Sequence, residues 1–554
     1  MLRNDPSHRN LFNADCNFLF VGDIPAEPDG PFSVNVLHRF VDLVAESGVD
    51  TYVCNANAQK PWYPSRVLPS ILEGYKRGDR EFARRQFRPA SKTDSTPDRL
   101  EKQMATTAAM LDRYLDLVEA KADWLAHIST ACRRNHISPW LSIRMNDGHG
   151  ANSWEGSYMN CALQKEPRYR LSGREINPRR PANHYQQLLN YEHAEVRDYY
   201  FTMAREMVED YDFEGLELDW LRTPLCCEAP ASQKTIDTMT EWIGEIRALT
   251  QRQAARTGQP YPLGLRLPVR LGLLREIGLD VKAMARQGLI DFVSFSNFWQ
   301  TSWDVPYDEL RRELGETVAI YGVVEAAPNA LLGFEPVTGL RNKRLTPASA
   351  ELLRGNAAGK LATGCDGIET FNFFCADSNL HTGGGQPAIY SALRGLGDLA
   401  TLRGLPKHYA LAARPGLYEF PIYEYAEQLP ATVEAQGWRA FRLAMCAEPP
   451  GKLHDLTVQL VLSAPTAGAA PELGVSFNSS QPNFAAQATN TMLFRNGALT
   501  DHIPEHRAYN FRFDPAMIRE GWNEILVTND SRPDTSSSSA PPAVRIVSVE
   551  VALR

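Results

Sequence analysis

One stretch decides the fold: Phe213-Glu214-Gly215-Leu216-Glu217-Leu218-Asp219-Trp220-Leu221-Arg222-Thr223-Pro224. It predicts a short strand with Leu216 and Leu218 on one face and Glu217 and Asp219 on the other, because strand side chains alternate. Long helical patterns precede and follow it, which is typical of a parallel strand covered by helices. Neither face of such a strand is exposed to solvent. The two carboxylates must therefore point into a closed barrel or its mouth, where they are costly unless used or neutralised.

Strand and helix patterns alternate on both sides of this stretch over about 400 residues. The other expected strands cover 17–23, 49–57, 138–146, 261–269, 291–299, 318–326 and 367–374. The expected helices cover 34–47, 114–135, 194–210, 232–255, 347–363 and 388–401. Eight strands alternating with helices predict an α/β fold, a (β/α)8 TIM barrel. A doubly wound sheet would need a Gly-rich phosphate turn after the first strand, which Val21-Gly22-Asp23-Ile24-Pro25 does not provide.

The chain divides into two regions that differ in their pattern of expected secondary structure. Residues 1–403 contain the expected catalytic barrel, with insertions at about 58–112 and 147–193 that are too long for plain connections. Residues 404–554 show short β segments between Pro, Gly, Asn and Ser clusters, which predicts a β-sandwich of jelly-roll type. Its expected strands cover 417–425, 438–446, 456–463, 472–478, 509–514, 523–529 and 544–553. This second domain either packs on the barrel or also binds sugar, and both roles stay open.

Composition and charge exclude several classes of protein. The 554 residues, 43% of them hydrophobic, can bury a full core and a second domain, and the net charge of −8 lacks the basic footprint of nucleic-acid binding. The polar start is unlike a signal peptide and no run is long enough to cross a bilayer, so we expect a cytoplasmic protein without a membrane partner, although a trimmed leader would leave the same pattern. Nine cysteines without a CxxC predict reduced thiols and no zinc site.

The barrel prediction locates the site, because active sites of this fold lie at the C-terminal ends of the strands. Glu217 and Asp219 occupy inward positions of their strand. The corresponding inward positions near the ends of the other expected strands hold Asp23, Asn55, Asn57, Arg144, Asn146, Arg266, Asn297, Trp299, Glu325 and Glu369. Such residues are poor core material, whereas a sugar would satisfy all of their hydrogen bonds. Arg144 and Arg266 have the alternative role of neutralising Glu217 or Glu369. Arg222, a further candidate for substrate binding, has the alternative of shaping the loop before Pro224.

The two insertions leave from the same end of the barrel and carry aromatic residues. We expect Trp62, Tyr63, Trp154 and Tyr158 to wall a pocket and to provide stacking platforms for sugar rings. A walled pocket favours exo action or short substrates.

The segment GLELDWLRTP resembles the fourth-strand motif of uncharacterised glycosyl-hydrolase-like barrel glycosidases, roughly G-[IV]-x-L-D-[WY]-[IL]-R-x-P. This resemblance implies glycoside hydrolysis at Asp219. A second resemblance is to the large retaining clan with its acid/base at the end of strand four and its nucleophile at the end of strand seven, where Glu325 lies; that clan has Asn-Glu where this chain has Leu-Asp-Trp. The segment IREGWNEILV (518–527) resembles galactose-binding-like jelly rolls.

Glycoside cleavage needs one protonated acid and one ionised group, and their separation decides the stereochemical outcome. Glu217 and Asp219, roughly 6 to 7 Å apart along one strand, form one candidate pair. Asp219 and Glu325, across the barrel, form the other. No cofactor is expected, and the expected partner is a carbohydrate.

Two other classes of protein are alternatives to the glycosidase. The first is a non-catalytic carbohydrate-binding or structural protein on a barrel scaffold. An open cleft with Asp219 and a second acid roughly 5 to 10 Å apart favours the enzyme, whereas acids all locked to arginine favour this rival. The second is a metal-dependent hydrolase, which is disfavoured because no His-x-His or His/Asp set falls at the strand ends.

Overall fold

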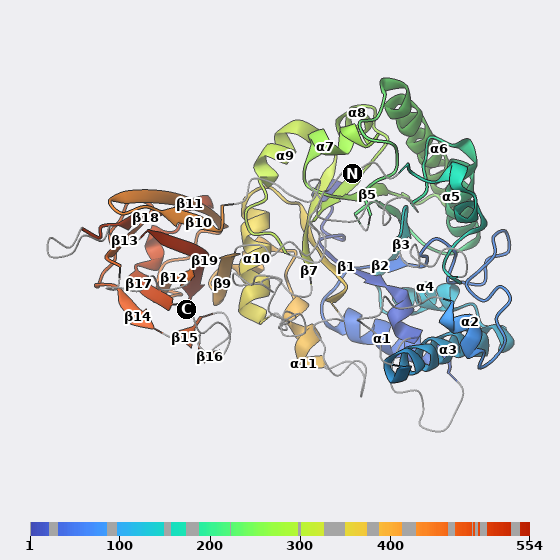
Figure 1. The fold of residues 1–554 in the computed structure, drawn as a ribbon, viewed down its shortest axis with the longest axis horizontal. Helices are drawn as coiled ribbons and strands as arrows, with labels where there is room; N and C mark the ends of the chain where they lie inside the picture. Colours follow the sequence, from blue (N-terminus) through green and yellow to red (C-terminus); the bar gives the residue numbers. More distant parts are fainter. Residues whose placement is uncertain are drawn as a thin grey trace.

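Eight parallel strands close into a barrel in the computed structural model, each pairing with the next and β8 with β1 (Figure 1). The strands are β1 Asn10–Asp15, β2 Thr51–Asn55, β3 Ser138–Arg144, β4 Leu216–Asp219, β5 Leu263–Leu267, β6 Phe292–Phe295, β7 Ala319–Glu325 and β8 Gly367–Phe371. The predicted (β/α)8 barrel is thereby confirmed. The structure describes residues 2–20, 32–85, 97–148, 157–172, 188–221, 223–296, 301–325, 349–373, 387–412, 428–463, 471–489, 491–493, 497–498, 507–532 and 543–554.

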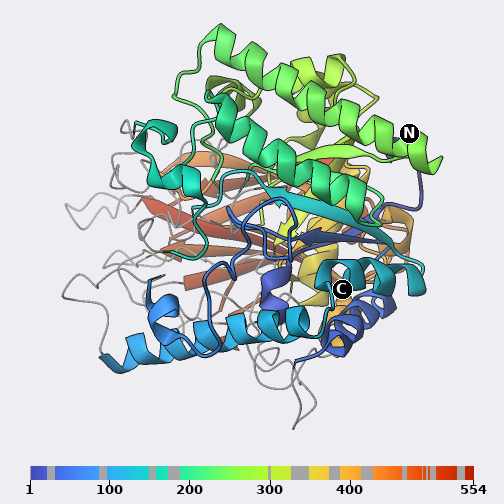
Figure 2. The same cartoon turned by 90° about the vertical axis from the view of Figure 1, so that its right-hand side faces the viewer.

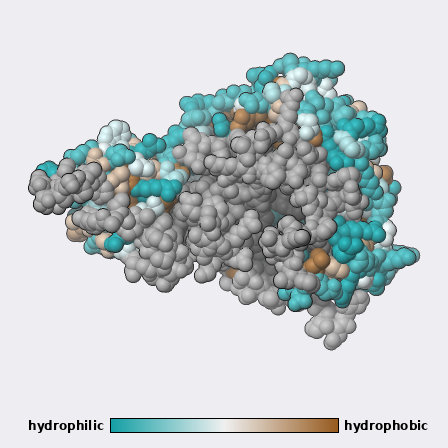
Figure 3. Space-filling model, viewed as in Figure 1, coloured by the Kyte–Doolittle hydropathy of each residue, from teal (hydrophilic) through white to brown (hydrophobic). Residues whose placement is uncertain are grey.

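Helices cover the outside of the barrel, and Figure 2 shows α5 and α6 side by side along one flank. The helices are α1 Val34–Glu46, α2 Arg80–Arg84, α3 Pro97–Glu119, α4 Trp124–Arg134, α5 Ala194–Asp210, α6 Gln233–Thr257, α7 Leu271–Glu276, α8 Val281–Arg286, α9 Tyr307–Leu314, α10 Ala350–Ala362, α11 Pro387–Tyr390 and α12 Leu399–Leu402. Their outer faces are predominantly hydrophilic on the side drawn in Figure 3, as expected for helices that bury one stripe. None of the described helices combines the length and apolar character that a bilayer crossing requires.

The first strand lies earlier than predicted. It is Asn10–Asp15, and the predicted segment 17–23 begins with a 3-10 helix, Cys16–Phe20. The apolar run in Cys16–Phe20 resembles a strand, whereas Asn10–Asp15 carries polar side chains at inward positions and does not. Asp23, expected at the end of this strand, lies outside the described residues, and Asp15 ends β1 instead.

Two of the predicted helices are broken. The segment 114–135 contains the end of α3 and all of α4, and Lys121 between them has a φ of 56° that a continuous helix does not allow. Most of α3 lies inside the predicted insertion at 58–112. The closing helix expected at 388–401 is split into α11 and α12, with Gly395 between them at a φ of 73°.

The C-terminal region is the predicted β-sandwich. One sheet has the order β10-β19-β12-β17-β14, with β9 also on β19, and the other has the order β11-β18-β13. The strands are β9 Lys407–Ala412, β10 Ala431–Val433, β11 Gly437–Met445, β12 Leu456–Ser463, β13 Leu473–Phe477, β14 Gln487–Thr489, β17 Arg507–Phe513, β18 Gly521–Asn529 and β19 Val544–Leu553, with β15 Thr491–Met492 and β16 Gly497–Ala498 as a separate hairpin. The sequence did not predict β9 or β10, and its strand 417–425 lies outside the described residues.

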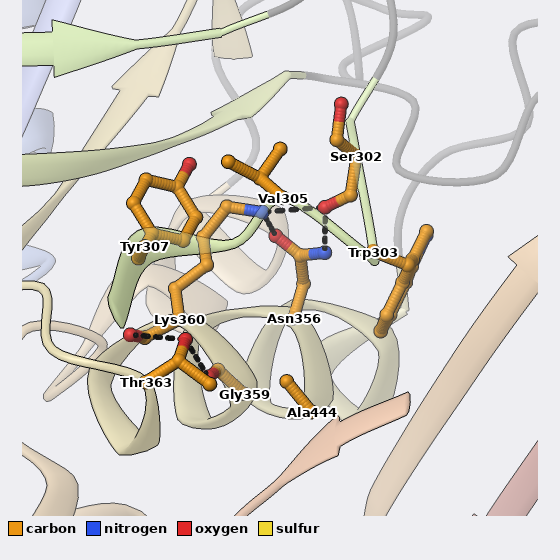
Figure 4. A pocket seen from close by; sticks show the side chains of 9 residues that line it. All are labelled: Ser302, Trp303, Val305, Tyr307, Asn356, Gly359, Lys360, Thr363 and Ala444. Carbon is orange, nitrogen blue, oxygen red and sulfur yellow. Dashed lines mark hydrogen bonds between the residues drawn. The ribbon is translucent and has the colours of Figure 1, made fainter. Parts of the chain in front are cut away.

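Helix α10 joins the barrel to the sandwich. Lys360 Nζ donates hydrogen bonds to the Ser302 carbonyl and to Asn356 Oδ1, both at 2.6 Å, beside the sandwich residue Ala444 (Figure 4). Two glycines let the helix backbone approach the sheets: a Cβ on Gly355 would lie 2.2 Å from the His408 carbonyl oxygen on β9, and one on Gly359 would lie 2.4 Å from that of Ala444. The contact between the two regions is therefore close and specific.

Gly355→Ala is expected to lower the free energy of unfolding by about 1 to 3 kcal/mol, the usual cost of overpacking, because helix α10 must move away from β9. Urea denaturation measures this change. Gly244→Ala in α6 is the matched control, since its Cβ would meet nothing nearer than 3.9 Å, and the higher helix propensity of alanine should leave it neutral or stabilised. Equal stability of the two variants would contradict the close contact.

The described cysteines are buried free thiols, and the Sγ atoms of Cys16 and Cys54 lie 3.2 Å apart.

Candidate functional site

The barrel interior changes from apolar to charged along its axis. At the N-terminal end of the strands, an apolar cluster fills it: Leu2, Leu11, Val53, Trp140, Phe292, Ala319 and Tyr321. Further along the same strands, inward positions carry Asn13, Ser142, Glu217, Ser294 and Glu369, and at the C-terminal ends Asp15, Arg144, Asp219, Arg266 and Glu325. The charged residues therefore lie at the end of the barrel where active sites of this fold occur.

Arg266 on β5 is the centre of this charged region. Its Nη1 donates to Asp219 Oδ2 and its Nη2 to Glu325 Oε1, each at 3.2 Å, while its Nε lies 3.4 Å from Glu369 Oε1. Its guanidinium carbon lies 3.4 Å from the centre of the Phe371 ring. Burial opposes the charge of Arg266, yet the surrounding carboxylates raise its pKa above its ordinary value. Arg266 thus contacts Glu369, one of the two carboxylates that it was expected to neutralise, together with Asp219 and Glu325.

Asp219 ends strand β4 and is only 2% exposed. Its Oδ1 accepts a hydrogen bond from the backbone N–H of Leu221 at 2.9 Å, and its Oδ2 accepts from Arg266. The next residue, Trp220, points the other way and packs on Tyr191 with ring centres 5.1 Å apart. The alternation predicted from the sequence therefore places Asp219 inward and anchors the strand end on its outer side.

Glu325 ends strand β7 in a different environment. Its Oε1 accepts from Ser296 Oγ at 3.2 Å as well as from Arg266, and its backbone N–H donates to Thr301 Oγ1 at 2.8 Å. Burial raises the pKa of Glu325 to about 8; Arg266 and Ser296 act against this rise, and the charges of Glu369 and Asp219 add to it. Burial therefore favours the protonated form of Glu325 near neutral pH.

Asp219 and Glu325 are close enough to act on one bond. Because each oxygen lies 3.2 Å from a terminal nitrogen of the same guanidinium, the two oxygens are no more than about 9 Å apart. This upper limit includes the separations used by both retaining and inverting glycosidases.

The raised pKa of Glu325 predicts a pH-dependent stability. Between the ordinary pKa of 4.5 and about 8, the folded protein holds a proton that the unfolded chain has released, so stability falls as the pH rises. We expect Glu325 to contribute a slope of up to about 1.4 kcal/mol per pH unit over this window. Urea denaturation from pH 5 to 8 measures this slope, and Glu325→Gln should reduce it, whereas Glu309→Gln, at an exposed position on α9, should not. An identical slope in both variants would contradict the assignment.

Arg144 on β3 forms a second charged group at the same end. Its Nη2 pairs with Asp15 Oδ1 and its Nη1 with Asp147 Oδ2 at 2.7 Å. Asn372 donates to Asp15 Oδ2 at 2.8 Å, and its φ of 48° marks the sharp turn after β8. The guanidinium lies 5.5 Å from the Trp62 ring. Arg144 thus neutralises Asp15 and Asp147 rather than Glu217 or Glu369, and the sequence did not predict these two partners.

Three asparagines predicted to bind substrate have amide groups already bonded to the backbone. Asn55 donates to the Ser142 carbonyl at 3.2 Å, and Asn57 donates to the Arg144 carbonyl and accepts from the Arg144 N–H. Asn146 donates to the carbonyls of Leu189 and Leu225. These side chains fix the strand ends and the loops beyond them.

The stacking role predicted for two aromatic residues is wrong. Tyr63 is fully buried and donates to Glu206 at 2.8 Å, and Tyr158 is 5% exposed and packs on Phe82. Trp62 is also buried and covers Arg144. Both insertions therefore contribute to the core as well as to the mouth of the barrel. The remaining predicted residues, Trp154, Arg222, Asn297 and Trp299, lie outside the described residues.

The fold and the charged centre define the class of protein as a (β/α)8 barrel, followed by a β-sandwich, with carboxylates gathered around one buried arginine. Among the described residues, no group of His, Cys, Asp and Glu is arranged to hold a metal ion.

Comparisons with known proteins give distant structural likeness and no family. No family model and no curated protein matches the sequence. The PgaB (BpsB) glycoside hydrolase domain from Bordetella bronchiseptica is 10% identical with a TM-score of 0.37, over 68% of this chain and 99% of that domain. The α-L-fucosidase isoenzyme 1 from Paenibacillus thiaminolyticus is 12% identical with a TM-score of 0.35, over 96% of this chain and all of that one (100%). A maltogenic α-amylase, AmyB from Thermotoga neapolitana, is 9% identical with a TM-score of 0.35, over 95% and 99%. Likeness at this level carries no functional inference.

Proposed function

We propose that this protein is a glycoside hydrolase in which Asp219 and Glu325 form the catalytic pair. One observation carries the proposal: two carboxylates from β4 and β7 meet at one guanidinium at the C-terminal end of the barrel, and burial raises the pKa of Glu325. A carboxyl group with a raised pKa beside a second carboxylate is a usual arrangement for an acid and a base in one site.

The environments assign a role to each carboxylate. Glu325, which holds its proton at neutral pH, acts as the general acid and protonates the leaving glycosidic oxygen. Asp219 accepts from a guanidinium and a backbone N–H, both of which stabilise a carboxylate, and it acts as nucleophile or as the base that activates water. This assignment reverses the roles that the resemblance to the retaining clan implies for strands four and seven.

Arg266 contributes to the reaction through its contacts with both acids. When Glu325 gives up its proton, the guanidinium 3.2 Å away stabilises the carboxylate that forms. The same cation holds the Asp219 carboxylate in place while positive charge develops at the anomeric carbon. The substrate in this proposal is a carbohydrate.

A panel of aryl glycosides and oligosaccharides tests the proposal, with product stereochemistry followed by NMR. Release of the aglycone by the wild-type protein and its loss in Asp219→Asn is the expected result. A well-folded protein that cleaves no member of a broad panel would overturn the proposal.

The second candidate function is a carbohydrate-binding barrel without catalysis. It is favoured by the near-complete burial of Asp219 and Glu325, 2% and 5% exposed, with both already bonded to Arg266. Calorimetric binding of a sugar that the protein does not hydrolyse, equally tight in wild type and in Asp219→Asn, would establish this alternative.

A further inference from the structure

Two further carboxylates lie inside the barrel, and one side chain connects them. Asn13 Nδ2 on β1 donates to Glu217 Oε1 at 2.8 Å and to Glu369 Oε1 at 3.0 Å. Because one nitrogen contacts both oxygens, these oxygens are at most about 6 Å apart. Glu217 and Glu369 are both 0% exposed, so neither charge is screened by water.

The two carboxylates receive different donors. Glu369 accepts from Ser294 Oγ at 2.5 Å and from Asn13, and it lies 3.4 Å from the cationic Nε of Arg266. Glu217 accepts neutral hydrogen bonds from Asn13 and from Ser142 Oγ at 2.9 Å, and its Oε2 accepts none from the described residues. Burial raises the pKa of Glu369 above its ordinary value, but the cation and the short hydroxyl bond act against this rise, so the ionised form is more favoured at Glu369 than at Glu217.

The charges around Arg266 cannot all be present at once. One guanidinium contacts Asp219, Glu325 and Glu369. Asn13 donates hydrogen bonds to both Glu369 and Glu217. Two buried carboxylates this close do not both ionise at neutral pH, because each disfavours the charge of the other. Burial, followed by the charges of Glu369 and Asp219, raises the pKa of Glu217 well above its ordinary value.

We propose that Glu217 is held as a neutral carboxylic acid and Glu369 as a carboxylate, and that this pair positions Arg266 between Asp219 and Glu325. Both are positioning residues, so Glu217 is not a member of the catalytic pair that its place on β4 suggests. The assigned protonation states do not depend on the proposed glycosidase function, whereas the effect on turnover rests on it.

Matched isosteric variants separate the two roles. Glu217→Gln replaces one neutral group by another, so we expect its melting temperature at pH 7 to stay within about 2 °C of wild type. Glu369→Gln removes the anion from beside a buried cation, and we expect a fall of at least about 5 °C. One protonated-carboxyl band should also disappear from the infrared spectrum of Glu217→Gln at pH 7. Equal destabilisation of the two variants, or no lost band in Glu217→Gln, would overturn the protonation assignment whether or not the protein is a glycosidase.

The pH profile of hydrolysis tests the positioning role. The groups that face Glu325 are Arg266 on β5, Ser296 after β6, Glu369 on β8 and Asp219 on β4. Because the charge of Glu369 raises the pKa of Glu325, Glu369→Gln should move the alkaline decline of kcat/KM to lower pH, and Glu217→Gln should leave it in place with kcat within about threefold of wild type. An unmoved profile in Glu369→Gln, or a loss of kcat in Glu217→Gln as large as in Asp219→Asn, would refute the positioning role.

Discussion

Asp219→Asn is expected to lower kcat by a factor of about 10² or more while the protein stays folded. Asparagine keeps the size of the side chain and still accepts the Leu221 N–H through its Oδ1, but it loses the negative charge that a nucleophile or base requires. Arg266 keeps Glu325 and Glu369 as partners, so the variant leaves no unpaired cation in the barrel. Steady-state kinetics with the best aryl glycoside and a thermal melt measure the two expectations.

Asp291→Asn is the matched control for this loss of charge. Asp291 accepts two hydrogen bonds from Arg247, at 2.5 and 2.9 Å, at the opposite end of the barrel, just before β6. We expect this control to lose some stability and to keep its kcat. Turnover near the wild-type rate in Asp219→Asn would end the proposed mechanism, whatever the stability of the two variants.

Arg266→Met is expected to give a large loss of stability. It removes the cation from between Asp219, Glu325 and Glu369, and breaking a buried ion pair typically costs about 3 to 5 kcal/mol because the remaining charge is left without a partner. Arg133→Met is the control, since this surface arginine, with a side chain 40% exposed, pairs with Asp212 and Glu214 at the surface, and the expected cost is about 1 kcal/mol or less.

The loss in Arg266→Met should depend on pH. Without the guanidinium, the buried carboxylates are stabilised only when they are protonated, so the variant should regain stability as the pH falls, and the difference from wild type should be largest above neutrality. Urea denaturation at pH 5 and pH 8 measures this difference. If Arg266→Met were as stable as Arg133→Met at pH 8, Asp219 and Glu369 would not be charged, and the role of nucleophile or base given to Asp219 would fail.

The helix and strand pattern was predictable because it is local. The strand at 216–219 and the helix at 194–210 were found because apolar residues alternate in the one and recur at helical spacing in the other. The first strand was missed because its inward positions hold Asn13 and Asp15, which lower its apparent β character. Polar side chains of a site weaken the apolar pattern by which the sequence would indicate a strand.

The sequence by itself determined which side chains point into the barrel. Side chains alternate between the two faces of a strand, and this alternation placed four residues inside the barrel: Asp219, Glu325, Arg266 and Glu369. Only the tertiary structure decided which of them are partners. Asn13 lies 204 residues from Glu217 and 356 from Glu369 in sequence, and closure of the sheet between β1 and β8 brings all three together. Strand parity is set by backbone geometry at each residue, whereas partnership depends on the tilt and stagger of all eight strands together, and no single segment of the sequence encodes that arrangement.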